Sequence, residues 1–234
     1  MGWLPWALIA PMRSLAEGVI KPWRQLEPYL NRFGLRARKR GSQDGPIEPG
    51  LAVAPRKACA EEHSVEEAIT DGLTGLKTRR YFREALQGEW RRSARSSRPF
   101  SVIMMDLDGF KQVNDQGGHL EGDRVLAAVA ALLDARLRQP SVVARYGGDE
   151  FAILAPETGA QQAEILAERL RAAVEADHFL HAHEVTASIG TATFPDHGRT
   201  PEDILKVADR CMDLAKHSGG NCVKVTPPSP NQRK

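Results

Sequence analysis

The chain has 234 residues, 41% of them hydrophobic, which suits one domain of ordinary size with a packed core and an additional segment. Its formal net charge of +2 is too close to neutral to favour nucleic acid as the main partner, so we expect none. Three scattered cysteines without C-x-x-C spacing argue against a disulfide framework or a zinc site and fit a cytoplasmic protein.

Residues 1–40 form a basic leader that contains three tryptophans. Its first twelve residues, MGWLPWALIAPM, are apolar but too few to span a bilayer, which takes about 20 residues. They also lack the features of a signal peptide. The tryptophans beside RARKR at 36–40 leave three interpretations: a weak peripheral contact with the anionic inner membrane, a poorly ordered leader, or the remnant of a larger upstream region.

Turn-forming residues separate this leader from the rest of the chain. Residues 41–59 are rich in Gly and Pro and are typical of a linker. Residues 60–70, AEEHSVEEAIT, have a helical composition, and the Pro-rich tail 227–234 is expected to be disordered. The predicted folded domain is therefore 71–226.

Within this domain the apolar patterns predict alternating helices and strands. Thr78 is placed to cap a helix over 79–92, and FSVIMMDLD is continuously apolar before its acids, as in a strand buried on both faces. The predicted elements after that helix are a strand at 100–108, a helix at 121–138, a hairpin at 142–154, a helix at 159–176, a strand at 185–194, a helix at 201–216 and a strand at 221–225. This order predicts an α+β fold, with helices around a mixed, largely antiparallel sheet of about five strands.

The hairpin carries two acids directly after two glycines, in RYGGDEFAIL. Gly147 and Gly148 predict a tight turn in which glycine supplies a positive φ. The acids are Asp149 and Glu150. The turn therefore sets carboxylates beside a backbone that something can approach closely.

Two further acids, Asp106 and Asp108, end the buried strand. If the hairpin lies beside that strand, Asp106 and Asp149 converge, and clustered carboxylates with open sides suit Mg²⁺ and the phosphates of a substrate. Lys111 then offers a positive charge, which indicates phosphoryl or nucleotidyl transfer.

Two bland alternatives and one other enzyme class remain at this point. The strand-end acids can simply cap the strand, and DLDG resembles the haloacid-dehalogenase phosphatases, although Phe110 stands where they usually have Thr. A calcium loop is disfavoured because Gly109 is fourth rather than sixth.

Several motifs in order resemble the GGDEF-domain diguanylate cyclases over about residues 65–226. They are DGLTGLKTRRYF, DLDGFKQVND, GHLEGD, RYGGDEF and SIG. The resemblance implies a fold akin to nucleotide cyclases and polymerase palm domains. It also implies that two GTP become cyclic di-GMP and two pyrophosphates, in a homodimer whose domains meet face to face, with residues 60–70 as the signalling and dimerisation helix.

The resemblance also implies roles at the reacting centre. Asp106, the Leu107 carbonyl and Asp149 are expected to hold Mg²⁺ or Mn²⁺. Asp149, Glu150 and Lys111 are the expected catalytic residues. Phe110 and Lys111 face the β- and γ-phosphates, and the hairpin glycines let the backbone pass close to the nucleotide.

Further substrate residues follow from the same resemblance. Asn114 and Asp123 match the positions that read guanine, and Asp123 favours GTP over ATP. His119 is the matching substrate-side histidine, and Lys216 meets the terminal phosphates. The alternatives for Asn114, Asp123 and His119 are an ordinary turn residue, a helix-start acid and a structural histidine.

Three departures from the family pattern affect regulation and affinity. The inhibitory product site keeps Arg138 but has Ser141 in place of Asp, so product inhibition should be weak. Gly220 replaces an Arg, which removes one charge-assisted contact worth roughly 1.5–3 kcal/mol. Asp213 stands where Tyr is frequent, without a consequence that we can derive. An active cyclase and a catalytically weak GTP-binding, receptor or interaction module are therefore both hypotheses.

Overall fold

The computed structural model describes residues 69–226. The predicted leader, linker and tail, and all but the last two residues of the predicted helix 60–70, lie outside the described residues. The elements in chain order are β1 (Lys77–Thr78), α4 (Arg79–Ser96), β2 (Phe100–Asp108), α5 (Phe110–Gly117), α6 (His119–Arg136), β3 (Val142–Arg145), β4 (Glu150–Pro156), α7 (Ala160–Glu175), α8 (His178–Ala182), β5 (Thr186–Phe194), α9 (Pro201–His217) and β6 (Val223–Val225).

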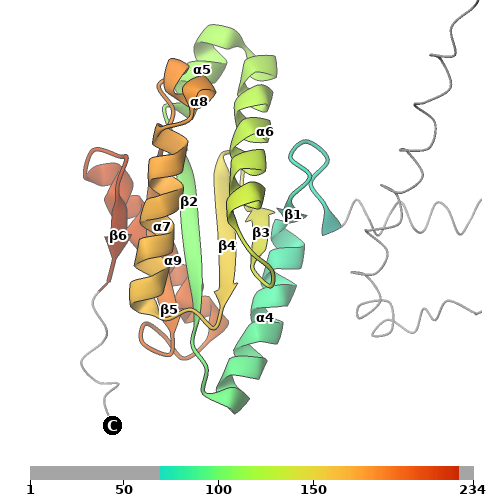
Figure 1. The fold of residues 1–234 in the computed structure, drawn as a ribbon, viewed down its shortest axis with the longest axis vertical. Helices are drawn as coiled ribbons and strands as arrows, with labels where there is room; N and C mark the ends of the chain where they lie inside the picture. Colours follow the sequence, from blue (N-terminus) through green and yellow to red (C-terminus); the bar gives the residue numbers. More distant parts are fainter. Residues whose placement is uncertain (1–68, 227–234) are drawn as a thin grey trace, which may run out of the picture. The chain divides into compact units, whose positions relative to one another are not determined.

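The strands form one six-stranded sheet in the order β1-β3-β4-β2-β5-β6 (Figure 1). The central strand β2 is antiparallel to both neighbours, whereas β1 is parallel to β3 and β6 is parallel to β5. The α+β prediction is confirmed, but the predicted number of five strands is one too low. The additional strand is β1, whose two residues pair with Ala144 and Arg145 and are too few to produce a periodic pattern.

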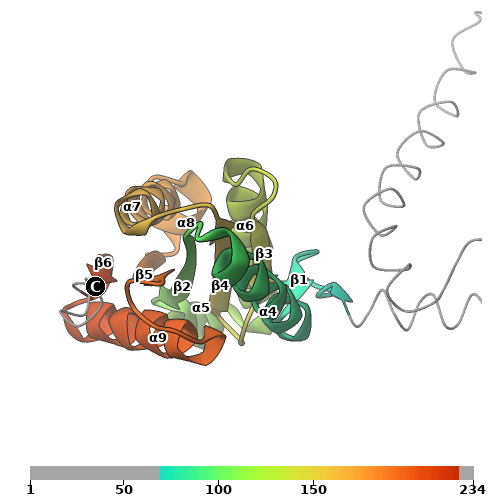
Figure 2. The ribbon, with the colours of Figure 1, turned by 90° about the horizontal axis from the view of Figure 1, so that it is seen from below.

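Helices cover both faces of the sheet, with α6 and α7 on one side and α4 and α9 on the other (Figure 2). Along β2, Ile103 and Met105 belong to the core with α6 and α7. Val102 and Met104 belong to the core with α4 and α9. This sandwiching explains why the strand is continuously apolar rather than alternating.

The predicted helices are present with shifted ends, and two short helices were missed. The Thr78 side chain accepts a hydrogen bond from the Tyr81 amide, as predicted for the cap, and Pro201 begins α9. The missed helices are α5, with eight residues, and α8, with five. Neither is long enough to show an amphipathic repeat. No helix among residues 69–226 is both long enough and apolar enough to cross a bilayer.

The strand register gathers polar residues at one end of the sheet. Asp106 of β2 lies opposite Glu150 of β4 on one side and Ser188 of β5 on the other. The end of β2, the β3–β4 turn and the start of β5 therefore meet there, and α5 follows directly from β2.

Candidate functional site

Asp106 is a buried carboxylate at this end of the sheet, with only 6% of its surface exposed. Its pKa is raised from 3.8 to about 6, mainly by burial and also by the negative charges of Asp149 and Glu150, whereas the hydrogen bond and charge of Lys216 act to lower it. The sequence-based expectation that the hairpin acids converge on the end of β2 is therefore confirmed.

Lys216 of α9 provides the positive charge that this cluster attracts. Its ammonium nitrogen lies 2.7 Å from an Asp106 carboxylate oxygen. Burial acts to lower the pKa of Lys216, but the hydrogen bond to Asp106 and the charges of the three acids raise it overall. The position in front of Asp106 is therefore occupied by a cation, the Lys216 ammonium.

The β3–β4 turn is built differently from the predicted one. Neither Gly147 nor Gly148 has a positive φ, so that part of the prediction is wrong. The amides of Tyr146 and Gly147 both donate to the Glu150 carbonyl, at 2.7 and 3.2 Å. Four residues, rather than two, separate the strands, and this longer connection has no need of a left-handed pair.

Gly147 is instead packed against the side chain of Glu150. A Cβ atom there would lie 2.4 Å from a carboxylate oxygen of Glu150, so the Glu150 side chain folds over the glycine. A Cβ at Gly148 would meet nothing within 4 Å. The hairpin therefore has one glycine packed against its own acid and one that faces open space.

Arg145 and Asp71 hold this turn, and neither was singled out from the sequence. The Arg145 guanidinium donates to the Gly148 carbonyl at 2.8 and 3.1 Å and lies 3.4 Å from Asp71. Asp71 also accepts from the amide and hydroxyl of Thr74. The Asp-x-x-Thr spacing in DGLT, which favours such a local turn, was the available signal.

Asp108 does not join the acid cluster. Its carboxylate accepts hydrogen bonds from the Thr186 hydroxyl at 2.9 Å, the Ser188 hydroxyl at 2.7 Å and the Asn221 amide at 2.8 Å. These bonds tie β2 to β5 and to the loop before β6. Asp108 is therefore a structural acid, and Asp106 is the one that remains available.

The expected phosphate-side residues begin α5. Phe110 is buried, and its neighbour Lys111 is exposed at the helix start directly after the end of β2. Leu107 is buried within β2 beside Asp106. Phe110 and Lys111 therefore follow closely in the chain after the end of β2 that carries Asp106.

The expected guanine-side residues come together across the α5–α6 turn. A Cβ at Gly122 would lie 2.1 Å from the Asn114 side-chain oxygen, so the Asn114 side chain rests directly on Gly122. Asp123 follows at the start of the second turn of α6, and both polar residues are partly buried. His119 is exposed at the first position of α6.

The three departures from the family pattern also lie on described segments. Arg138 and Ser141 share one turn, where the Ser141 amide donates to the Arg138 carbonyl at 2.9 Å. Gly220 has φ +75°, and a Cβ there would lie 3.0 Å from the Asp108 carboxylate. Asp213 is exposed on α9, and its backbone carbonyl bonds to the His217 ring.

The oxygen ligands in this cluster are of the kind that a divalent metal binds. Within residues 69–226, no three His, Cys, Asp or Glu side chains already surround one point as ligands. Mg²⁺ needs only one or two carboxylates, however, and takes water and phosphate oxygens as the rest. The buried Asp106, with its ammonium partner and two acids nearby, meets that requirement. Chemically, the arrangement can gather cations and an anionic phosphate ester at one place.

Comparisons with known proteins identify the family of this domain. A family model described as "Diguanylate cyclase, GGDEF domain" matches residues 68–222. The response regulator PleD of Caulobacter vibrioides is 41% identical over 167 residues, which cover 69% of this chain and 37% of PleD. The diguanylate cyclase DgcP of Pseudomonas aeruginosa is 38% identical over 70% of this chain and 25% of DgcP. The chain thus spans well under half the length of these relatives.

Solved structures are similar in fold. The coiled coil and GGDEF domain of DgcB from Caulobacter crescentus, in complex with c-di-GMP, matches with a TM-score of 0.66 and 28% identity over 73% of this chain and 92% of that one. The diguanylate cyclase SiaD of Pseudomonas aeruginosa, in complex with its activator SiaC, matches with a TM-score of 0.62 and 31% identity over 91% of this chain and 76% of that one.

Proposed function

Because the chain belongs to the GGDEF-domain diguanylate cyclase family, we propose that it condenses two GTP molecules to cyclic di-GMP with release of two pyrophosphates. The observation that carries the proposal is the buried Asp106 opposite Glu150, with the charge of Asp149 close enough to raise its pKa. A carboxylate in that setting gains most from a cation.

In this proposal Asp106, the Leu107 carbonyl and Asp149 hold Mg²⁺ or Mn²⁺. The metal supplies Lewis-acid stabilisation of charge on the phosphates. Asp149 accepts the proton of the attacking ribose 3′-hydroxyl, and Glu150, folded over Gly147, keeps the turn in shape. Gly148, beside open space, lets the backbone approach the nucleotide.

Positive side chains hold the phosphates. Lys111, exposed at the start of α5, stabilises the negative charge that develops on the transferring group. Lys216 has 36% of its side chain exposed, and in this proposal it turns from Asp106 towards the terminal phosphates. Phe110 is buried and anchors the start of α5.

Guanine is read from the α5–α6 turn. The Asp123 carboxylate accepts from the ring and exocyclic N–H groups of guanine, which adenine does not present in the same way. Asn114, packed on Gly122, adds a directional amide, and His119 lies on the substrate side. Each domain binds one GTP, so the active form is a homodimer with two facing sites.

A second candidate is a catalytically weak domain that binds GTP as an interaction module. The observation that favours it is Gly220, which brings no charge to the loop beside Asp108. A receptor for cyclic di-GMP is disfavoured, because Ser141 removes an acid from the inhibitory site whereas the catalytic acids are kept.

Mass spectrometry of the products formed from GTP and Mg²⁺, at several protein concentrations, tests the proposal. We expect cyclic di-GMP at a rate that rises more than linearly with protein, and no product from Asp149→Ala. Asp134→Ala, which changes an exposed acid near the end of α6, is the control and should keep full activity. GTP binding without product at high protein concentration would refute the cyclase and support the binding module.

A further inference from the structure

The first turn of α6 is attached to a distant segment through Glu121. A Cβ at Gly117 would lie 2.8 Å from the Glu121 Cβ, so the Glu121 side chain lies across the end of α5. One carboxylate oxygen of Glu121 bonds to Arg124 at 3.1 Å. The other lies 3.0 Å from Nε2 of His183, the residue that follows α8.

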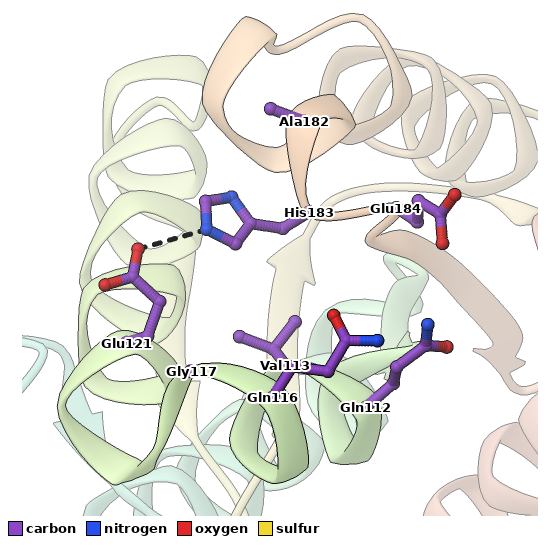
Figure 3. Close-up of a pocket in the computed structure, with 8 residues that line it drawn as sticks. All are labelled: Gln112, Val113, Gln116, Gly117, Glu121, Ala182, His183 and Glu184. Carbon is purple, nitrogen blue, oxygen red and sulfur yellow. Dashed lines mark hydrogen bonds and ion pairs between the residues drawn. The ribbon is translucent and has the colours of Figure 1, made fainter.

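His183 is held in turn by its own helix. Its Nδ1 lies 2.8 Å from the Phe179 carbonyl oxygen, and its ring packs against the Phe179 ring with centroids 4.5 Å apart. Glu121 and His183 have 23% and 25% of their side chains exposed. Figure 3 shows the imidazole reaching from the α8 turn to Glu121 across the rim of a hollow of about 450 Å³.

Both ring nitrogens of His183 face acceptors. A backbone carbonyl and a carboxylate can only accept, whereas a neutral imidazole carries one N–H. The bonds to the Phe179 carbonyl and to Glu121 therefore form together only when His183 and Glu121 share two protons, one for each bond. We call this Glu121–His183–Phe179 arrangement the clasp.

Few other charges face the clasp. Figure 3 shows the Glu184 carboxylate on the opposite side from the imidazole, and α5 contributes only neutral amides there. The neighbouring titratable and charged groups are Arg124 on α6, Asp177, His178 and His181 on α8, and Glu175 on α7, which pairs with Arg171. Of these, Arg124 bonds directly to the clasp, through the second carboxylate oxygen of Glu121.

The same turn also supports the other end of the α5–α6 pair. A Cβ at Gly109, directly before α5, would lie 2.9 Å from the Glu184 carbonyl oxygen. Residues 183–184 therefore contact the start of α5 through Glu184 and the start of α6 through the clasp. Asn114 lies in the chain between these two points, and Asp123 lies two residues beyond Glu121 on α6.

We propose that Glu121 and His183 are positioning residues for guanine recognition. The clasp holds the first turn of α6 so that Asp123 and Asn114 keep the separation that one guanine ring requires. This inference rests on the proposed function. It predicts an effect on nucleotide binding rather than on the chemical step at Asp149.

The test uses the full chain and the variants Glu121→Met, His183→Leu and their combination. Methionine keeps the aliphatic stem over Gly117 and removes the acceptor. His178→Leu on the same short helix is the control, because the His178 side chain is exposed and makes no hydrogen bond within residues 69–226. Melting temperatures within a few degrees of the parent establish that each variant is folded.

We expect each single variant to raise KM for GTP about fivefold to twentyfold with kcat changed less than about twofold, and the double variant to be no worse than the singles. His183→Gln, which keeps one donor, should recover part of the affinity that His183→Leu loses. An unchanged KM, a loss confined to kcat, or multiplicative effects in the double variant would overturn the clasp.

Calorimetry with a non-hydrolysable GTP analogue separates this inference from the proposed catalysis. Weaker analogue binding by the variants supports the clasp even if the parent chain forms no cyclic di-GMP, which would refute only the cyclase. Absence of analogue binding by the parent chain would overturn the clasp as well, because no guanine site would exist to be positioned.

Discussion

Two buried titratable side chains lie at opposite ends of the sheet and are satisfied in different ways. Asp106, at the end of β2, has its pKa raised to about 6 by burial and by neighbouring acids, and its partner is the half-exposed Lys216. His197, beyond the other end of β5, is 8% exposed, and its Nδ1 accepts from the Thr193 amide at 2.8 Å. Burial lowers the pKa of His197, although Asp196 and the Thr226 backbone act to raise it.

The difference shows where the fold tolerates an unfavourable charge. At the His197 end burial favours the neutral ring, whose Nδ1 accepts a backbone hydrogen bond, so no counter-charge is required. At the Asp106 end an ionised acid lies among other acids, and a cation improves the arrangement. Residues kept in such a destabilised state are typical of functional sites.

The largest expected effect is a difference in cyclic di-GMP formation between variants at the Asp106 end and at the His197 end of the sheet. Asp106→Asn removes the negative charge that we propose holds the metal, so cyclic di-GMP formation should fall by about three orders of magnitude. His197→Gln, in which the amide oxygen can still accept from Thr193, should keep activity within about twofold. Initial rates at saturating GTP and Mg²⁺ check this, and comparable losses in both variants would erase the distinction.

The second effect concerns stability without metal at the Asp106 end. Because the folded-state pKa is raised from 3.8 to about 6, the contribution of Asp106 is present below about pH 4 and is lost as pH rises through 6. The full shift corresponds to about 3 kcal/mol. Asp106→Asn should therefore be more stable than the parent by about 1–3 kcal/mol at pH 7.5, as measured by urea unfolding in a chelator.

Asp108→Asn is the matched control, two residues along the same strand. Asp108 accepts three hydrogen bonds, so its replacement should destabilise the fold by about 1–3 kcal/mol. The same sign in both variants would contradict the division between a functional and a structural acid.

A smaller effect with the opposite dependence on pH is expected at the His197 end. Since the folded-state pKa lies below 6.5, the unfolded chain binds more protons, and the stability present above pH 6.5 is lost as pH falls. His197→Gln should remove this loss of stability at acid pH. The change of stability between pH 4 and 6 that arises from Asp106 should remain. Urea midpoints across that range, compared with the parent, provide the measurement.

The smallest effect concerns Gly220. Its φ of +75° and its closeness to Asp108 disfavour any side chain, so Gly220→Ala and Gly220→Arg share a backbone cost of about 1 kcal/mol. Only Arg adds a cation near the phosphates, and it should lower KM for GTP about threefold to tenfold relative to Ala. Equal KM values would show that the missing Arg does not limit binding.

Much of the fold follows from local patterns, and the exceptions share one cause. The long helices, the buried strand 100–108 and the hairpin were predictable because each carries its own periodicity or turn residues. The strand β1 and the helices α5 and α8 are too short for such a signal. The role of Gly147 was misread because this glycine has no left-handed φ and instead packs against the Glu150 carboxylate.

The sequence by itself determined the alternation of elements, the presence of the acids and, through ordered motifs, the family. Only the tertiary structure decided which acid does what. Asp106 and Asp108 occupy similar places in the sequence. The Asp108 carboxylate accepts hydrogen bonds from β5 and from Asn221, whereas the hairpin places Glu150 opposite Asp106. The link between Glu121 and His183 joins residues 62 positions apart, and no local pattern encodes a contact between side chains so distant along the chain.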